Sequence, residues 1–157
     1  MDRSIEIRYE VFSSLDELSA SDKELAKAAI AAQKTSYAPY SKFNVGAALL
    51  MGNGEIVPGS NQENAASPSG LCAERTAMFA AAVRYPGVPM KALAITGGHK
   101  MSICDEPATP CGGCRQVMAE YQKLAGGPIS VLLIGARQIW KFARIDDLLP
   151  FIFTSLD

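Results

Sequence analysis

A hairpin followed by alternating helices and strands is the feature that most restricts the fold of this chain. Residues 43–60 are predicted to form two strands joined at Asn53-Gly54, because Asn-Gly supplies the two positive φ values of a tight hairpin turn. Helical patterns at about 72–85 and 112–124 then alternate with three apolar strands, KALAITGG, ISVLLIG and QIWKFA. This order predicts an α/β fold with a mixed sheet covered by helices on both faces.

The N-terminal part predicts one more strand and one more helix. IEIRYEVF, residues 5–12, alternates apolar and polar side chains as a strand does. Ser21 and Glu24 then have the spacing of a capping box, so we expect a helix from about Ser21 to Ser36. Near the C-terminus, RIDDLLPF predicts a short helix or turn.

Composition favours one folded domain over residues 1–157 and disfavours several classes of function. Hydrophobic residues make up 48% of the chain and charged residues 20%, an ordinary globular balance. The net charge is −1, without a Lys/Arg run that could follow a phosphate backbone, so we expect no nucleic-acid partner. Without a signal-peptide pattern or an apolar run of membrane-spanning length, we expect a cytoplasmic protein with no membrane partner.

A CxxC motif, Cys111 to Cys114, lies just before a predicted helix and follows Pro110. Two thiolates at this spacing can bind one tetrahedral zinc at about 2.3 Å each. The motif alone also fits a redox dithiol or two buried cysteines. In a reducing compartment the four cysteines favour thiol or metal chemistry over disulfides, and a third ligand is needed to decide.

The stretch LCAERTA places a third thiol, an acid and a base at the start of another predicted helix. Cys72 and Glu74 can approach one metal only from the helix N-terminus, because residues two apart in mid-helix point about 200° from each other. Arg75 is placed to hydrogen-bond the sulfurs, unless it is a plain surface charge. Three ligands leave a fourth position open for water, and Glu74 beside it could carry protons. The alternative for Glu74 is an acid favoured in a first helical turn.

C-A-E followed by P-C-x-x-C is the three-cysteine form of the zinc deaminase signature, and the chain resembles the cytidine deaminases of the short, homotetrameric kind. The resemblance covers about three quarters of the chain, from SYAPYSKFNVGAALL through NQENAASPSGLCAERTA and TPCGGCRQVMAE to DDLLPFIF. It implies a three-layer α/β/α sandwich around a mixed five-stranded sheet. Residues 1–20 go beyond the short family pattern as an N-terminal extension, for which an extra edge strand and an oligomer contact are the two expectations.

The resemblance also implies an activity. This is zinc-dependent hydrolytic deamination of cytidine and 2′-deoxycytidine to uridine and 2′-deoxyuridine, with release of ammonia, in pyrimidine salvage. It implies one Zn²⁺ per chain held by Cys72, Cys111 and Cys114, with Glu74 as the catalytic proton shuttle. It further implies a homotetramer in which neighbouring subunits complete each other's pockets.

Five residues are implied to contact the nucleoside. Asn61 and Glu63 match the pair that holds the ribose hydroxyls, and Phe43 matches an aromatic residue beside the nucleoside. The backbone of Ala73 is expected near the pyrimidine O2, and Phe153 matches a C-terminal phenylalanine that closes a neighbour's pocket. By charge alone, Glu63 would repel a 5′-phosphate or a polynucleotide backbone that lies on its side of the ribose, which favours a free nucleoside. A turn role for Asn61 and a core role for Phe43 are the alternatives.

Departures from the family pattern leave other functions open. Gln62 stands where an apolar residue is common, and Ser67 stands where a tyrosine is common. We therefore expect the part of the pocket that holds the sugar to be looser or differently hydrogen-bonded. A deaminase of another cytosine-bearing small molecule, such as blasticidin S, would share both motifs. A non-catalytic zinc module would use Cys104 as a fourth thiolate, whereas His99 is interpreted as a loop residue and not a ligand.

Overall fold

A single mixed sheet forms the middle layer of the molecule. The computed structural model describes residues 1–156, and its six strands are arranged in the order β1-β6-β5-β4-β2-β3. Only β4 and β5 are parallel neighbours, and each other neighbouring pair is antiparallel. The mixed sheet is confirmed, with six strands in place of five. The strands are β1 (Glu10–Phe12), β2 (Phe43–Met51), β3 (Ile56–Ser60), β4 (Met90–His99), β5 (Ser130–Ile134) and β6 (Ile139–Phe142).

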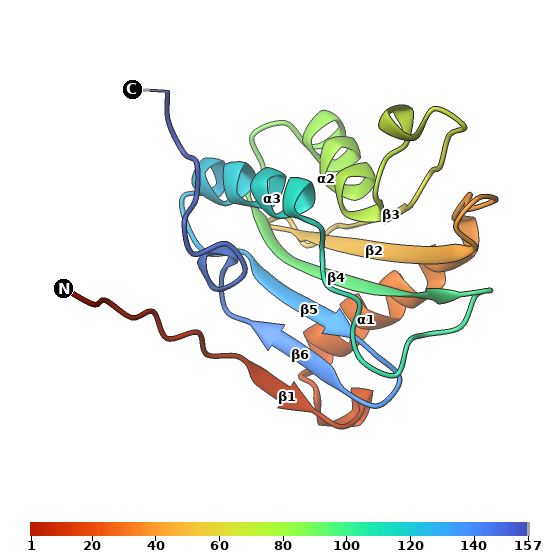
Figure 1. Cartoon of the computed structure of the whole chain (residues 1–157), viewed down its shortest axis with the longest axis horizontal. Coiled ribbons are helices and arrows are strands. Elements are labelled where there is room, and N and C mark those ends of the chain that lie inside the picture. Colours follow the sequence, from red (N-terminus) through yellow and green to blue (C-terminus); the bar gives the residue numbers. More distant parts are fainter. Residues whose placement is uncertain (157) are drawn as a thin grey trace.

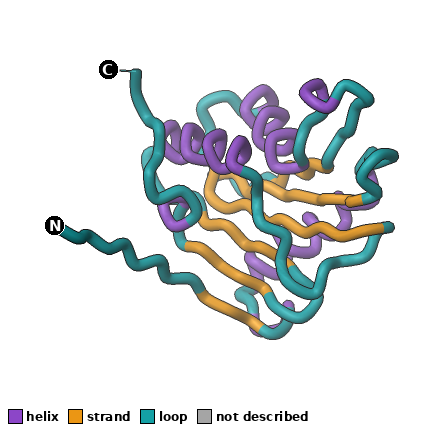
Figure 2. Tube along the Cα trace, in the orientation of Figure 1, coloured by secondary structure: helices purple, strands orange, loops and turns teal. Residues whose placement is uncertain are grey.

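Three helices cover the two faces of the sheet, as Figures 1 and 2 show. α1 (Ala20–Ala32) packs on one face, and α2 (Ala73–Arg84) and α3 (Gly112–Ala125) pack on the other. The predicted three-layer α/β/α sandwich is therefore confirmed. A 3₁₀ turn at Ile145–Asp147 follows β6, where the sequence predicts a short helix or turn. Within residues 1–156, no helix has both the length and the hydropathy needed to cross a bilayer.

The burial of β4 on both faces explains its nearly continuous apolar sequence. Leu93 and Ile95 pack in the hydrophobic cluster beneath α2 and α3, whereas Ala92 and Ala94 pack in the cluster beneath α1. A strand covered by helices on both sides lacks the polar face that produces alternation. β4 thus forms the centre of both hydrophobic layers.

α1 begins earlier than the capping-box pattern predicts. The N-cap is Ser19, whose Oγ accepts a hydrogen bond from the backbone N–H of Asp22 at 3.2 Å, so the prediction of a cap at Ser21 was wrong. The helix ends at Ala32, and the 3₁₀ turn Gln33–Thr35 replaces its last predicted turn. Two serines near the helix start both offer a capping hydroxyl, and the structure uses the first of them.

The β2–β3 hairpin forms as predicted, but its turn differs. Only Gly54 has a positive φ, 88°, among the two turn residues. Asn53 instead uses its side-chain oxygen to accept a hydrogen bond from the backbone N–H of Glu55 at 3.1 Å. Asn53 therefore stabilises the turn as a side-chain acceptor and not as a second left-handed residue.

The N-terminal extension adds one strand to the edge of the sheet. β1 pairs antiparallel with β6, although only residues 10–12 of the predicted strand at 5–12 form this ladder. Residues 1–9 run outward from β1 in Figure 1 and make no ladder with the sheet.

Close packing of α1 on β2 depends on Gly46. A Cβ at this residue would lie 2.1 Å from the carbonyl oxygen of Ala29 and 2.5 Å from the backbone nitrogen of Gln33. Because both are backbone atoms, Gly46→Ala must push α1 off the sheet, and we expect a loss of about 3 kcal/mol in the free energy of unfolding. Denaturant titration measures the loss. Gly127→Ala is the matched control, since a Cβ there meets nothing within 4 Å; equal losses would contradict the packing argument.

Candidate metal centre and active site

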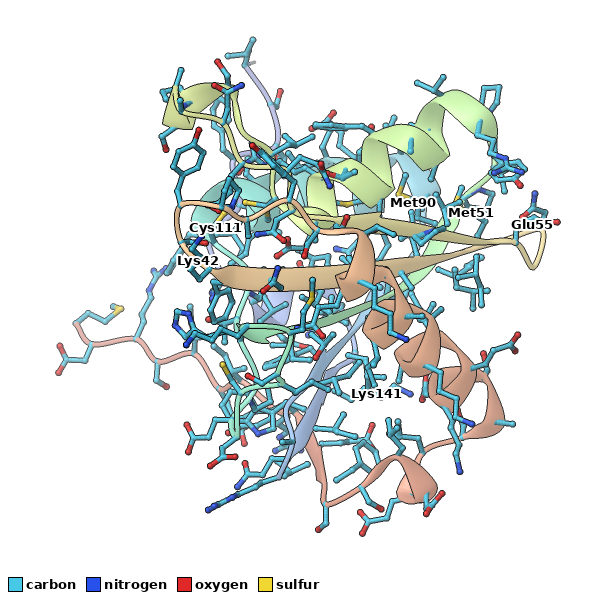
Figure 3. The ribbon with its side chains drawn as sticks, turned by 90° about the vertical axis from the view of Figure 1, so that its right-hand side faces the viewer. Lys42, Met51, Glu55, Met90, Cys111 and Lys141 are labelled. Atoms are coloured by element: carbon cyan, nitrogen blue, oxygen red, sulfur yellow. The ribbon has the colours of Figure 1, made fainter. Side chains whose placement is uncertain are left out.

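Three thiols converge where α2 and α3 begin. Cys72 is the N-cap of α2, Cys111 is the N-cap of α3, and Cys114 lies in the first turn of α3. Their Sγ atoms all lie within 4.8 Å of one another, and those of Cys72 and Cys111 are 3.9 Å apart. In Figure 3, Cys111 lies at the same end of the sheet as Lys42, away from the hairpin turn at Glu55. The structure thus brings two helix N-termini together at one end of the sheet.

This donor set fits a tetrahedral Zn²⁺ site. Sulfurs bound at about 2.3 Å in tetrahedral geometry lie about 3.8 Å apart, close to the spacing of Cys72 and Cys111. Three protein ligands leave one position open, as in catalytic zinc sites. Within residues 1–156, no second group of three or more ligand side chains could hold a metal, and Cys104 lies outside the cluster. His99 also lies outside it and packs its ring edge-on against Phe43, with centroids 5.0 Å apart.

The surroundings of the thiols favour a thiolate at Cys72. A hydrogen bond from the Cys114 thiol, together with the Arg75 guanidinium, lowers the pKa of Cys72 to about 5 despite its partial burial. The same interaction with Cys72 raises the pKa of Cys114, which keeps its proton in the metal-free protein. The N-terminus of α2 adds a partial positive charge beside Cys72. A cation bound here would displace the proton that these thiols share.

Arg75 supplies a positive charge next to the thiols. Its Nη2 donates to the Sγ of Cys72 at 3.4 Å, and this contact raises the pKa of Arg75 further above its usual value. Its Nε is buried without a hydrogen-bond partner among the described residues, so one donor remains beside the cluster. Three thiolates and one Zn²⁺ would sum to −1, and the guanidinium offsets that charge.

Glu74 places a buried carboxyl beside the thiols. Its side chain is in the first turn of α2, and the residue is only 5% exposed. Burial raises the pKa of Glu74 to about 7, and the nearby charge of Cys72 adds to this effect. A carboxyl with a pKa near neutrality can both accept and donate a proton at neutral pH. Ala73, fully buried between Cys72 and Glu74, fixes the backbone from which both side chains extend.

Asn61 connects the segment after β3 to the start of β2. Its Nδ2 donates to the carbonyl of Phe43 at 2.8 Å, and its Oδ1 accepts from the backbone N–H of Val45 at 2.8 Å. Each amide atom keeps one further hydrogen-bonding position. Asn61 therefore holds the half-buried Phe43 in place and can still bind a polar ligand group.

Glu63 lies two residues further along the same extended segment. Its carboxylate accepts hydrogen bonds from the backbone N–H and the hydroxyl of Ser41 at 3.2 Å. The segment itself is fixed because Tyr37 N–H donates to the carbonyl of Asn61 and Glu63 N–H donates to the carbonyl of Tyr37. Sequence reasoning missed Ser41, whose only signal was its place in SYAPYSKF beside Phe43.

Gln62 points away from Asn61 and Glu63, because neighbouring residues in extended chain face opposite sides. Its Nε2 donates to the carbonyl of Thr35 at 3.2 Å and to the Ser60 hydroxyl at 3.1 Å. The side chain therefore fastens this segment to the end of the 3₁₀ turn after α1. Ser67 is exposed and begins a separate 3₁₀ turn.

Phe153 is not packed into the site of its own chain. Its carbonyl accepts a hydrogen bond from Gln116 Nε2 on α3 at 2.7 Å, and the residue is 64% exposed. The C-terminal segment thus runs along α3 and leaves this ring available to solvent or to another subunit.

Arg115 holds the loop before the thiols, and sequence reasoning missed it. Its Nε donates to the carbonyl of Pro110 and its Nη1 to the carbonyl of Leu148, both at 2.8 Å. These bonds fix the loop that leads into Cys111. Its position directly after Cys114 was the available signal.

The fold is an α/β/α sandwich, and three thiols and a buried carboxyl meet at two helix N-termini. This combination defines the class of zinc-dependent hydrolases. Residues 19–125 match the family model described as the cytidine and deoxycytidylate deaminase zinc-binding region. The chain belongs to this family, and its cofactor is Zn²⁺.

Individual cytidine deaminases are similar to this chain in sequence and structure over most of its length. The cytidine deaminase of Halalkalibacterium halodurans is 41% identical over 133 residues, which cover 85% of this chain and 94% of the relative. The crystal structure of cytidine deaminase from Burkholderia pseudomallei matches with a TM-score of 0.72 at 38% identity, covering 87% of this chain and 100% of that one. That of Mycobacterium tuberculosis matches with a TM-score of 0.68 at 33% identity, with the same coverage of each chain. The predicted family resemblance is confirmed.

Proposed function

We propose that this protein catalyses the hydrolytic deamination of cytidine and 2′-deoxycytidine to uridine and 2′-deoxyuridine, with release of ammonia, in cytoplasmic pyrimidine salvage. The observation that carries the proposal is the buried Glu74 carboxyl, with its pKa near 7, beside a three-thiol cluster. A purely structural zinc site requires no such acid and is closed by four ligands. The names of the related enzymes support cytidine as the substrate.

The residues of the chain divide the chemistry between them. Zinc, when held by Cys72, Cys111 and Cys114, lowers the pKa of water so that it becomes a nucleophile at neutral pH. Glu74 takes one proton from the water, whose oxygen adds to C4 of the pyrimidine, and gives that proton to N3. It then takes the second proton from the added oxygen and delivers it to the amino group, which leaves C4 as ammonia. Arg75 and the two helix N-termini stabilise the negative charge of the thiolates throughout. Water and cytidine are thereby converted to uridine and ammonia.

The substrate residues orient the nucleoside against this centre. Asn61 and Glu63, on the same side of one extended segment, bind the ribose hydroxyls, and Phe43 packs beside the nucleoside. The buried backbone at Ala73 lies near the pyrimidine O2. Glu63 disfavours a 5′-phosphate because two negative charges would meet at short range.

A substrate panel tests this function directly. Zinc-quantified protein is mixed with cytidine, 2′-deoxycytidine, cytosine, cytidine monophosphate and blasticidin S, and loss of the cytosine ultraviolet absorbance is followed. We expect rapid turnover of the two nucleosides only. Turnover of blasticidin S alone, or of no compound at one zinc per chain, would reject the proposal.

Glu63 is expected to set the selectivity for a free nucleoside. Glu63→Gln removes charge-assisted hydrogen bonds to the ribose, so kcat/KM for cytidine should fall roughly 10- to 100-fold. The rate ratio of cytidine monophosphate to cytidine should rise, because the repulsion is also removed. Steady-state kinetics measure both quantities. Glu55→Gln, at the far hairpin turn in Figure 3, is the control, and an unchanged ratio in Glu63→Gln would refute the role.

We also propose a homotetramer in which Phe153 closes the pocket of a neighbouring subunit. The exposed ring and the open site of the single chain support this arrangement. Phe153→Ala should raise KM for cytidine about tenfold, from lost apolar burial, and leave zinc content unchanged. Light scattering and kinetics at several dilutions measure assembly and KM. Phe151→Ala alters a second exposed ring as the control, and a wild-type KM in Phe153→Ala would argue against a shared pocket.

A further inference from the structure

Residues 5–11, here called the N-terminal strand segment, lie outside the part of the chain that matches the family model, which begins at residue 19. Every second side chain in the segment is apolar, and these side chains are 44% to 56% exposed. They are Ile5, Ile7, Tyr9 and Val11. A flexible tail needs no such alternation, so the segment has the pattern of a strand, and its apolar face is only about half covered in the single chain.

The C-terminal end of the segment is fixed to the body of the protein. Val11 pairs with Trp140 in the β1–β6 ladder. Tyr9 stacks on Phe142 with ring centroids 5.1 Å apart and contacts Trp140 at 5.6 Å. The apolar side chains therefore continue one face of the sheet outward. Figure 1 shows the chain running on beyond β1, and its Glu6 and Arg8 line a pocket with Arg144 and Asp147 after β6.

This extension leaves a free strand edge. Residues 5–9 make no ladder with the sheet, and β1 is the outermost strand, so backbone N–H and C=O groups face solvent along the segment. Natural proteins usually shield long apolar strand edges, because such edges pair with other chains. An unshielded edge next to an apolar face is suited to pairing with another strand.

The charged side chains on the other face of the segment indicate which strand can pair with this edge. Glu6 and Arg8 form an ion pair along the segment, with Arg8 Nε 3.0 Å from Glu6 Oε1. If two copies pair antiparallel about Ile7, Glu6 lies opposite Arg8 of the second copy, and Ile5 lies opposite Tyr9. Pairing about Glu6 or Arg8 would instead place like charges opposite each other, which is destabilising. Pairing about Tyr9 would place Arg8 opposite Glu10 but would leave Glu6 opposite the apolar Phe12, so only pairing about Ile7 gives both Glu6 and Arg8 an opposite charge.

We propose that the N-terminal strand segment pairs antiparallel with the same segment of a second copy of this chain, with Ile7 at the two-fold axis. Residues 5–9 are self-complementary in charge and in apolar side chains, as a two-fold symmetric contact requires. The proposal does not rest on the deaminase activity, and its tests do not measure activity.

Disulfide trapping tests the register. Ile7→Cys is introduced into the Cys104→Ala variant, with the other three cysteines saturated with zinc. The Cys104→Ala variant without a new cysteine gives the background rate of cross-linking. Paired residues across an antiparallel ladder have Cα atoms about 4.5 to 5.5 Å apart, within the range that a disulfide spans. We expect Ile7→Cys to form covalent dimers at least tenfold faster than Val11→Cys. Val11 is similarly exposed but would lie roughly 26 Å from its own copy.

Equal trapping of Ile7→Cys and Val11→Cys would overturn the proposal, because it would indicate random collision. Faster trapping of Tyr9→Cys than of Ile7→Cys would overturn the register about Ile7. Each substitution lies at an exposed position, so none is expected to prevent folding.

Charge reversal tests the pairing independently. Glu6→Lys and Arg8→Glu each break the ion pair within a chain and place like charges opposite each other between copies. Each should slow trapping through Ile7→Cys roughly fivefold. A mixture of the two variants restores opposite charges only between chains, so mixed dimers should form near the original rate. Absence of this recovery would reject the intermolecular pairing.

Discussion

Glu74→Gln is expected to lower kcat for cytidine by about 10³-fold and to leave one zinc per chain. The substitution keeps the size and most of the polarity of a buried side chain, so the first turn of α2 should be preserved. It removes the group that accepts and returns the proton, and the ligand cluster among residues 1–156 contains only the three thiols and no carboxyl. Steady-state kinetics together with metal analysis of the same sample provide the measurement.

The control for this variant is Glu120→Gln, which makes the same chemical change at an exposed position of α3. It should keep wild-type turnover. Wild-type turnover in Glu74→Gln would rule out the proton-shuttle role. Loss of zinc along with activity would show that Glu74 supports the metal site and not the proton transfer.

Cys72→Ala is expected to weaken zinc binding more than about 10³-fold and to abolish turnover, because it leaves only two thiolates. Cys104→Ala should change neither property, since Cys104 lies outside the cluster. Competition with a chelator measures the affinity of each variant for zinc. If Cys104→Ala loosened zinc as much as Cys72→Ala, the site would be a four-thiolate structural one, and the enzymatic assignment would fail.

Much of the sandwich was predictable because its elements carry local patterns. β4, α3 and β5 each have the length and periodicity of one element, and their order predicts a parallel pair joined by a helix. The cap of α1 was not predictable in the same way. Ser19 and Ser21 are both suitable caps, and an acid follows each of them three residues later, so the local pattern does not choose between them.

The candidate site was predictable where its chemistry is concentrated in short motifs. Cys72 and Glu74 are two residues apart at one helix start, so the constraint on their directions could be read from the sequence. Other contacts join segments far apart in the chain. Arg115 bonds Leu148 across 33 residues, and Gln62 bonds Thr35 across 27, and nothing in either local sequence indicates the partner.

Cys72 comes before β4 in the sequence and Cys111 comes after it, and this placement links zinc binding to folding. Cys72 and Cys111 are 39 residues apart, and the chain between them includes β4, the strand at the centre of both hydrophobic layers. An unfolded chain offers zinc only the neighbouring pair Cys111 and Cys114, so the third ligand arrives once β4 lies between β2 and β5. Tight zinc binding and the placement of the central strand therefore stabilise each other, because the three-thiol site exists only when β4 is in place.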